Sequence, residues 1–235
     1  MYELHIANKN YSSWSLRPWI LLSALGIPFT ERLHWFQPEN SAFRSFSPSA
    51  LVPALVDGDI TVWDSLAIAE YVAEDHPQVW PANKAARAWA RSAAAEMHSG
   101  FSTLRTQCSM SVGIRVRLKD TPPALLRDLS RIDAIWNGGF SRFGGAYLAG
   151  GSFTAVDAFY APVVFRVQTY GLGFHLSPAA RAYVDRMLAE PAMRAWYEAG
   201  LAETVRDAPH EEDYVRYGEI IEDLRAPPSP VALEV

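Results

Sequence analysis

The residues best suited to chemistry are the hydroxyls of the motif Tyr11-Ser12-Ser13-Trp14-Ser15-Leu16-Arg17, which lies between a predicted strand and a predicted helix. A hydroxyl at a helix N-terminus can donate to a bound anion, while the helix dipole and the free N–H groups favour the negative charge. Ser12 and Ser13 are candidates for this role, although a serine at this place can also simply cap the helix. For Ser15 we favour the structural role.

Two more motifs open predicted helices. Asp64-Ser65 offers a hydroxyl and free N–H groups at a helix start, which suit a carboxylate. Asp64 can face an ammonium group or act as the helix N-cap, and the two roles are compatible. Thr154-Ala-Val-Asp157 fits the capping box pattern, with Asp in place of the usual Glu.

Hydrophobic periodicity predicts the elements that position the first two motifs. Alternating residues predict strands at 2–6, 30–36, 54–56 and 60–63, and helical spacing predicts helices at 15–25, at 41–46 and after Asp64. Asp57-Gly58, between the last two strands, is a hairpin signal. The order β-α-β-α-β-β-α predicts an α/β domain over residues 1–76, followed by a linker over 77–83 that contains proline.

After the linker, the pattern predicts helices only, in a domain over residues 84–210. Apolar residues between Trp89 and Val112 recur every three or four positions, which predicts one long helix over about 85–116 with a weak point at Gly100. Shorter helices are predicted to start at prolines further along the chain. We expect residues 211–235 to be a poorly ordered tail, with the charged stretch from His210 exposed to solvent.

The composition excludes several classes of protein. The 235 residues are 49% hydrophobic, which supports a folded core, and the net charge of −5 gives no general attraction to nucleic acid or to anionic membranes. The single cysteine, Cys108, excludes an internal disulfide and is expected to pack in the core. No metal-site spacing, transmembrane span or signal peptide is recognised, so we expect a cytoplasmic protein without a metal.

Together with Val52-Pro53, which directly precedes a predicted strand, these motifs resemble the glutathione S-transferase superfamily. The Ser-Ser-x-Ser-x-Arg run at 12–17 looks most like the zeta, or maleylacetoacetate isomerase, branch. The resemblance covers about residues 2–205. It implies a thioredoxin-like α/β N-terminal domain, an all-α C-terminal domain, glutathione as co-substrate, and a homodimer whose active sites face a groove between subunits.

The resemblance also implies roles for individual residues. The family's catalytic serine is the first of its pair and corresponds to Ser12, whereas the predicted helix start also allows Ser13, so both remain candidates for stabilising the glutathione thiolate. Pro53 is expected to follow a cis peptide bond, which leaves the backbone of Val52 free to pair with an extended peptide. Gln37 lies in the loop that is expected to hold the glycine end of glutathione.

At the other end of glutathione, Asp64 and Ser65 are expected to bind the γ-glutamyl group. The sequence departs from the zeta pattern at two places. Trp14 replaces a cysteine, which excludes a cysteine nucleophile there and reshapes the co-substrate pocket, and Trp14 is also expected to bind glutathione. Tyr170 holds the place of an arginine used on acidic substrates, with Arg166 one turn earlier, and this counts against an isomerase.

We therefore expect a glutathione transferase that adds the thiolate to small apolar electrophiles. Its co-substrate pocket is expected to include Trp14, His98, Phe101, Arg105 and Arg166, although for His98 we favour a role as a helix-surface or interface residue. One alternative is a glutathione-dependent cis–trans isomerase of the maleylacetoacetate type. A second is a non-catalytic glutathione- or ligand-binding or interaction protein on the same fold. Neither nucleic acid nor membrane is an expected partner.

Overall fold

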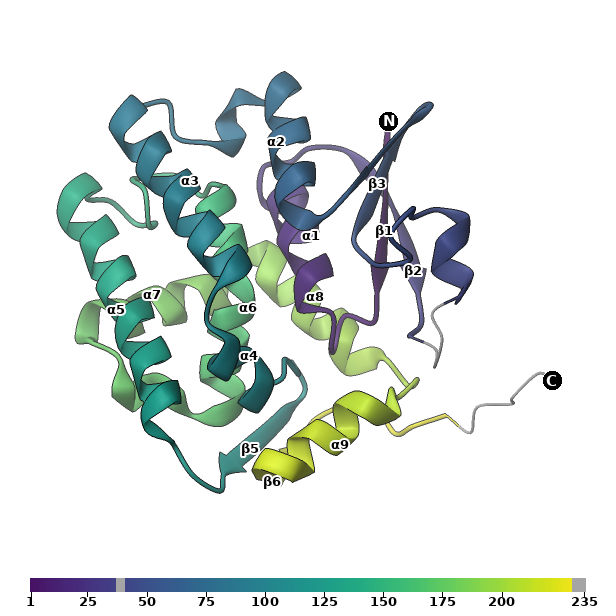
Figure 1. Cartoon of the computed structure of the whole chain (residues 1–235), viewed down its shortest axis with the longest axis vertical. Coiled ribbons are helices and arrows are strands. Elements are labelled where there is room, and N and C mark those ends of the chain that lie inside the picture. The colour runs from purple at the N-terminus through teal and green to yellow at the C-terminus, as the bar shows by residue number, and fades with distance from the viewer. Residues whose placement is uncertain (37–40, 230–235) are drawn as a thin grey trace.

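A mixed four-stranded sheet organises the N-terminal part of the chain. The computed structural model describes residues 1–36 and 41–229 (Figure 1). The strands are β1 (Tyr2–Ala7), β2 (Phe29–His34), β3 (Ala54–Asp57) and β4 (Ile60–Trp63), in the order β2-β1-β3-β4. β1 runs parallel to β2 and antiparallel to β3. Leu4 and Ile6 of β1 are fully buried, because they alternate toward the helices that cover the sheet.

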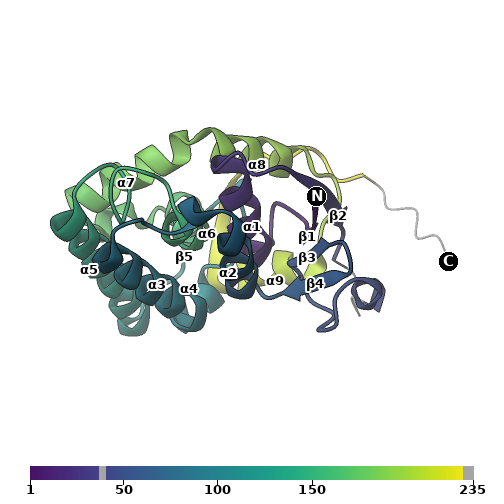
Figure 2. The same ribbon diagram turned by 90° about the horizontal axis from the view of Figure 1, so that it is seen from above.

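Two helices separate this sheet from the rest of the molecule. α1 (Ser13–Ala24) follows β1, and α2 (Ser65–Asp75) follows β4. Both lie between the strands and the helices of the C-terminal part, as Figure 2 shows from above. A short 3-10 helix, η1 (Ser41–Ser45), lies between β2 and β3. The N-termini of α1 and α2 therefore point at the boundary between the two parts.

The C-terminal part is built around one buried helix. Its helices are α3 (Lys84–Ser99), α4 (Ser102–Gln107), α5 (Pro123–Phe143), α6 (Ala155–Tyr170), α7 (Pro178–Ala189) and α8 (Pro191–Ala202), with the 3-10 turns η2 (Pro77–Val79) and η3 (Leu172–His175). Every residue of α6 except Gln168 is buried, and α6 packs against α1, α3 and α7. The predicted architecture, an α/β domain followed by a helical domain, is confirmed.

The capping box at the start of α6 forms as the sequence predicts. The side chain of Thr154 and the carboxylate of Asp157 both make the reciprocal bonds of this motif. Asp157 is fully buried and also accepts from the N–H of Leu148 at 2.9 Å and from the hydroxyl of Tyr183 at 3.0 Å. Burial raises its pKa to about 6, although the hydrogen bonds oppose this shift. One carboxylate therefore joins α6 to the preceding loop and to α7.

The long helix predicted over 85–116 is wrong. α3 ends at Ser99, Gly100 is extended, and Phe101 has a left-handed backbone with φ of 60° before α4 begins. The guanidinium of Arg105 donates to the carbonyls of Met97, His98 and Gly100, which satisfies the end of α3. The apolar spacing in the sequence continues through the break, because α3 and α4 both bury apolar side chains.

The prediction of helices only after residue 84 is also wrong. β5 (Ile114–Leu118) pairs antiparallel with β6 (Gly218–Asp223), which lies about a hundred residues later in the chain. A side chain at Gly218 would collide with Val116, since a Cβ placed there lies 2.3 Å from Cγ1 of that residue. The sequence pattern misses this ribbon because its two strands are far apart in the chain.

The tail predicted for residues 211–235 is ordered through much of its length. α9 (Ala208–Tyr217) leads directly into β6. Tyr214 of α9 is buried and donates to the carbonyl of Met110 at 2.9 Å. The domain boundaries at 76, 84 and 210 stay a prediction. Within the described ranges, no helix is long and apolar enough to cross a membrane.

Candidate functional site

A pocket of about 610 Å³ lies where the two parts of the chain meet. Its walls come from the loop before α1, the segments on either side of η1, the start of α2, the region of α4, and one side chain each from α6 and α9. The lining residues are Tyr11, Ser12, Ser13, Trp14, Phe36, Phe43, Ser49, Leu51, Val52, Pro53, Trp63, Asp64, Ser65, Arg105, Ser109, Met110, Arg166 and His210. Most of the predicted site residues are thus brought together.

The serines at the start of α1 differ in what their hydroxyls do. Ser12 is the N-cap residue and is buried, but its hydroxyl donates to the Oγ of Ser15 at 2.7 Å instead of capping the helix. Ser15 in turn accepts from the N–H of Ala7 at 3.2 Å, which ties β1 to α1. The Ser13 hydroxyl is half-buried and makes no hydrogen bond among the described residues. It is therefore available to a ligand without breaking an existing contact.

Tyr11 is a pocket residue that the sequence analysis did not single out. Its hydroxyl donates to the Oε1 of Glu211 at 2.7 Å. Burial and this carboxylate raise the pKa of Tyr11 well above its ordinary value. The phenol thus stays protonated and engaged with α9, and only its ring is offered to the pocket.

The start of α2 forms one wall of the pocket. The Oδ1 of Asp64 accepts from the N–H of Leu66 at 2.8 Å, so Asp64 caps the helix, and its φ is 77°. Its Oδ2 lies 3.2 Å from the Nε2 of His98. Ser65 is buried and accepts from the Nη1 of Arg17 at 3.3 Å, which leaves its own hydroxyl hydrogen for another acceptor.

The Val52–Pro53 peptide bond is cis and lies in the pocket wall, as the resemblance implies. Gln37, predicted at the glycine end of glutathione, lies outside the described residues. Two predicted co-substrate residues do not line the pocket. His98 stands behind Trp14, with ring centroids 5.2 Å apart, and Phe101 is buried at the α3–α4 break. Burial lowers the pKa of His98, although Asp64 opposes this shift.

Two lining arginines, Arg105 and Arg166, give the pocket a positively charged side, and a third, Arg17, packs on the ring of Trp14 without lining the pocket itself. The guanidinium carbons of Arg17 and Arg105 lie 4.1 Å and 4.8 Å from the ring centroid of Trp14, within the range of cation–π attraction. Arg166 is buried and donates through Nε to the carbonyl of Cys108 at 2.8 Å. Cys108 is itself buried, as predicted.

These arginines influence one another electrostatically. Burial and the charge of Arg105 lower the pKa of Arg166 to about 10. Burial, with the charges of Arg105 and Arg166, also lowers the pKa of Arg17. Among the described lining residues, Asp64 is the only carboxylate. The pocket therefore favours a ligand with negative charge.

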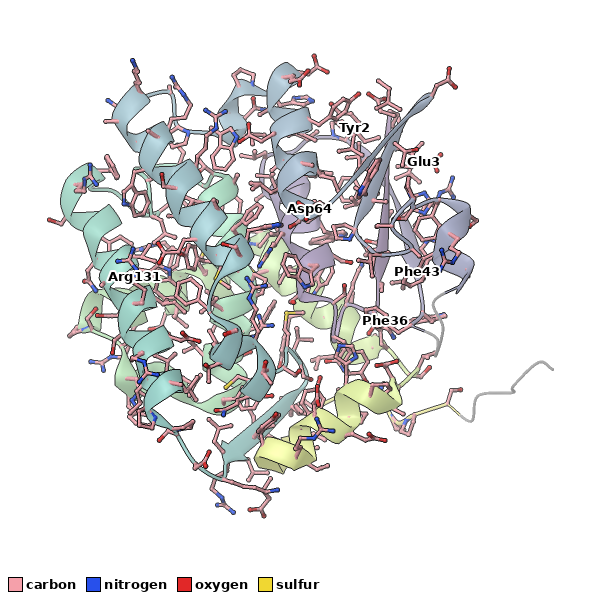
Figure 3. All side chains as sticks on the ribbon, in the orientation of Figure 1. Tyr2, Glu3, Phe36, Phe43, Asp64 and Arg131 are labelled. Carbon is pink, nitrogen blue, oxygen red and sulfur yellow. The ribbon has the colours of Figure 1, made fainter. Side chains whose placement is uncertain are left out.

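The sequence analysis missed the aromatic and α9 residues of the pocket. Phe36 follows β2 and Phe43 lies in η1; both line the pocket, and Figure 3 shows both apart from Asp64. His210 opens the charged stretch that the sequence predicts to be exposed to solvent, and no sequence signal connects it to the site. In the part of the chain that the structure describes, no group of three His, Cys, Asp or Glu side chains is placed to hold a metal.

Comparison with known families matches both parts of the chain. The model described as "Glutathione S-transferase, N-terminal domain" matches residues 11–75, and the one described as "Glutathione S-transferase, C-terminal domain" matches residues 87–199. No curated protein matches the sequence.

Solved structures with the same fold are distant in sequence. A glutathione transferase homologue from Burkholderia, solved with bound glutathione, is 20% identical, with 85% of this chain and 97% of that chain covered and a TM-score of 0.64. A Tau class enzyme from mango, Mangifera indica, is 17% identical, with 83% and 92% covered and a TM-score of 0.66. Glutathione transferase Omega 3C from Trametes versicolor is 19% identical, with 92% and 90% covered and a TM-score of 0.64.

Proposed function

The chain belongs to the glutathione S-transferase superfamily, and we propose that it is a glutathione transferase that transfers the thiolate to a small electrophile. The observation that carries this proposal is that one pocket contains the paired serines at the start of α1, the cis Val52–Pro53 segment and the start of α2. These groups match the three demands of an anionic thiol peptide: a thiolate donor, an extended backbone partner, and a carboxylate site.

In the proposed complex, glutathione lies along Val52 and places its γ-glutamyl carboxylate at the start of α2. The buried Ser65 hydroxyl donates to that carboxylate while Arg17 holds its oxygen. Asp64 caps α2 with one oxygen and has its second oxygen on the pocket side for the ammonium group, shared with His98. Ser12 or Ser13, at the start of α1, is the catalytic residue.

In this reaction the main task of the protein is to stabilise the glutathione thiolate. The thiol proton leaves to solvent, and the sulfur lone pair forms the new S–C bond while a leaving group departs or the electrophile accepts the electron pair. A hydroxyl and the N–H groups at the start of α1 stabilise the anion before attack. Between the two serines, Ser13 has the hydroxyl that no described residue occupies, whereas Ser12 must turn away from Ser15 to act.

The charge of the pocket supports the isomerase alternative as a second candidate. Arg105 and Arg166 both line the co-substrate side, and Arg105 lies over the ring of Trp14. Two guanidiniums with a single described carboxylate in the pocket suit an electrophile that carries a carboxylate better than a purely apolar one. In that reaction the thiolate adds to a double bond, the bond rotates, and the thiolate leaves again.

Three assays separate the candidates. We expect glutathione-dependent conjugation of a chloronitrobenzene, followed by absorbance, and test in parallel the isomerisation of maleylacetoacetate. Turnover of the second compound alone would replace the transferase with the isomerase. Tight glutathione binding by calorimetry without turnover of any of a broad panel of electrophiles would support the non-catalytic alternative.

A further inference from the structure

We propose that His210, supplied by α9, binds the glycine carboxylate of glutathione. This inference rests on the proposed function, since it assigns one end of the same bound peptide. It gives α9, which lies far from the sheet in the sequence, a direct role in the site. Figure 1 shows α9 lying below the start of α1 and beside β5.

The ring of His210 is held in the pocket wall by two aromatic neighbours. It stacks on Tyr11, with centroids 5.0 Å apart and planes at 26°, and on Phe36, with centroids 5.2 Å apart and planes at 29°. All three residues line the pocket. The imidazole is therefore fixed before a ligand arrives, which reduces the entropy cost of binding.

Asp207 determines which ring nitrogen is turned to the ligand. Its Oδ2 bonds to the Nδ1 of His210, and the same carboxylate accepts the N–H of His210 as the N-cap of α9. With Nδ1 engaged, Nε2 is the nitrogen that can meet a ligand. When Nε2 carries a hydrogen, it donates to an incoming carboxylate while Nδ1 stays bonded to Asp207.

The position of His210 selects the glycine end. In the proposed complex the γ-glutamyl group lies at Asp64 and Ser65, and the peptide continues along Val52. Phe36 follows β2 on the opposite side of the pocket, and Figure 3 shows Asp64 and Phe36 well separated. Arg105 and Arg166 approach instead from α4 and α6, and Arg105 lies over the ring of Trp14, on the co-substrate side. Among the described basic side chains of the pocket, His210 is the one that stacks on Phe36.

Contacts of other α9 residues with the rest of the fold hold His210 in its position. The carboxylate of Glu211 accepts from Tyr11 and pairs with the guanidinium of Arg225. Tyr214 bonds to the backbone of Met110 at 2.9 Å. These contacts tie α9 to the loop before α1 and to the segment before β5.

The test compares glutathione with γ-glutamylcysteine, which lacks only the glycine. Calorimetry gives the affinity of each for the full-length wild type, His210→Gln and His210→Phe. We expect both variants to lose about ten-fold in affinity for glutathione, the value of a hydrogen bond to a charged group, and to bind γ-glutamylcysteine as the wild type does. His210→Phe keeps the stacking on Tyr11 and Phe36, so a loss shared by both variants reports the ring nitrogen.

His76→Gln is the matched control, because His76 ends α2 outside this pocket. It should leave both affinities unchanged. An unaltered ratio of the two affinities in both His210 variants would overturn the inference and leave the proposed function standing. A wild type that binds neither peptide, while folded by circular dichroism, would overturn both.

Discussion

At the scale of single residues, the pocket contains some hydroxyls that are available to a ligand and others that are engaged in hydrogen bonds within the fold. Ser12 and Ser13 are neighbours with the same side chain, yet one hydroxyl is bonded to Ser15 and the other makes no bond among the described residues. Tyr11 is adjacent to both, but its hydroxyl is committed to Glu211. The family motif could thus be predicted from sequence, but the availability of each hydroxyl depends on three-dimensional contacts.

The first prediction concerns the thiol of bound glutathione. The hydroxyl that donates to sulfur should hold the thiol pKa below that of free glutathione, so its removal should raise this pKa and lower turnover together. Titration of the near-ultraviolet absorbance of the thiolate in Ser12→Ala and Ser13→Ala identifies the donor. The other variant should lose at most the value of a structural hydrogen bond, about 1 kcal/mol of stability. Wild-type pKa and turnover in both variants would refute the serine mechanism.

A second prediction tests the γ-glutamyl site. Ser65→Ala removes the buried hydroxyl beside Arg17 and should weaken glutathione binding by about 1 kcal/mol or more. Calorimetry measures the change. Ser92→Ala is the control, since Ser92 is exposed on α3 and bonds only to its own helix. Equal affinity of the Ser65 variant and the wild type would place the γ-glutamyl group elsewhere.

At the scale of elements, local signals could be predicted and distant pairings could not. The strands, the hairpin at Asp57-Gly58 and the capping box before α6 all arise from residues that are close in sequence. The break at Gly100 depends on a left-handed Phe101 and on the side chain of Arg105. The β5–β6 ribbon needs two strands that are close only after folding, so periodicity within either one does not reveal the partner.

The capping box of α6 gives the third prediction. Asp157→Ala leaves the N–H groups of Leu148 and Thr154 and the hydroxyl of Tyr183 without their buried acceptor. We expect a loss of about 3 kcal/mol in the free energy of unfolding in urea. Asp185→Ala removes an exposed carboxylate from α7 and should change it by less than about 0.5 kcal/mol. Similar midpoints for the two variants would contradict this account.

The fourth prediction concerns the loop that carries the serines. The carboxylate of Glu203, just after α8, accepts from the N–H groups of Lys9 and Asn10. Burial nevertheless raises its pKa to about 7 from 4.5, against the effect of these bonds. The folded state therefore retains this proton where the unfolded state has lost it. The contribution of Glu203 is complete below the unfolded pKa and is lost as pH rises through about 7.

Urea unfolding of the wild type and Glu203→Gln at a series of pH values checks this sign. The difference in unfolding free energy between them should change by about 1–3 kcal/mol between pH 4.5 and 7.5, because glutamine does not titrate. A difference that is constant with pH would show that folding does not raise the pKa of Glu203.

At the scale of the whole molecule, the site depends on segments from both ends of the chain. The N-terminal part supplies the serines and the start of α2, while α4, α6 and α9 complete the pocket. The sequence motifs identify the N-terminal half of the site, because each motif lies at the end of its own element. His210 and the anchoring of Tyr11 cannot be predicted in this way, since they require the chain to return after 200 residues.

We also predict a C₂ homodimer. The argument from a long helix no longer holds, since α3 spans only Lys84–Ser99. Exposed apolar side chains around β4 now support an interface, because Leu51, Ile60 and Trp63 are 63%, 51% and 46% exposed. Sedimentation at micromolar concentration should give twice the chain mass of 26.1 kDa. A mass near that of one chain would contradict the prediction.

The last prediction tests whether the contacts between the segment after β6, α9 and the loop before α1 stabilise the fold. The side chain of Arg225 is only 3% exposed, and its guanidinium pairs with Glu211 and with Asp223. Both carboxylates help to raise the pKa of Arg225 above its ordinary value, so it stays charged.

Arg225→Met keeps the length of this side chain but leaves Glu211 partly buried without its cation, and Tyr11 loses a neighbour of its hydroxyl. We expect a loss of about 3 kcal/mol in the free energy of unfolding. Arg216→Met is the matched control on α9, where an exposed pair with Asp213 should contribute less than about 1 kcal/mol. Because Glu211 also anchors Tyr11 beside the serines, Arg225→Met should lower glutathione affinity as well, measured by calorimetry. Equal stability and equal glutathione affinity in the two variants would show that the contacts of Arg225 with α9 stabilise neither the fold nor the glutathione site.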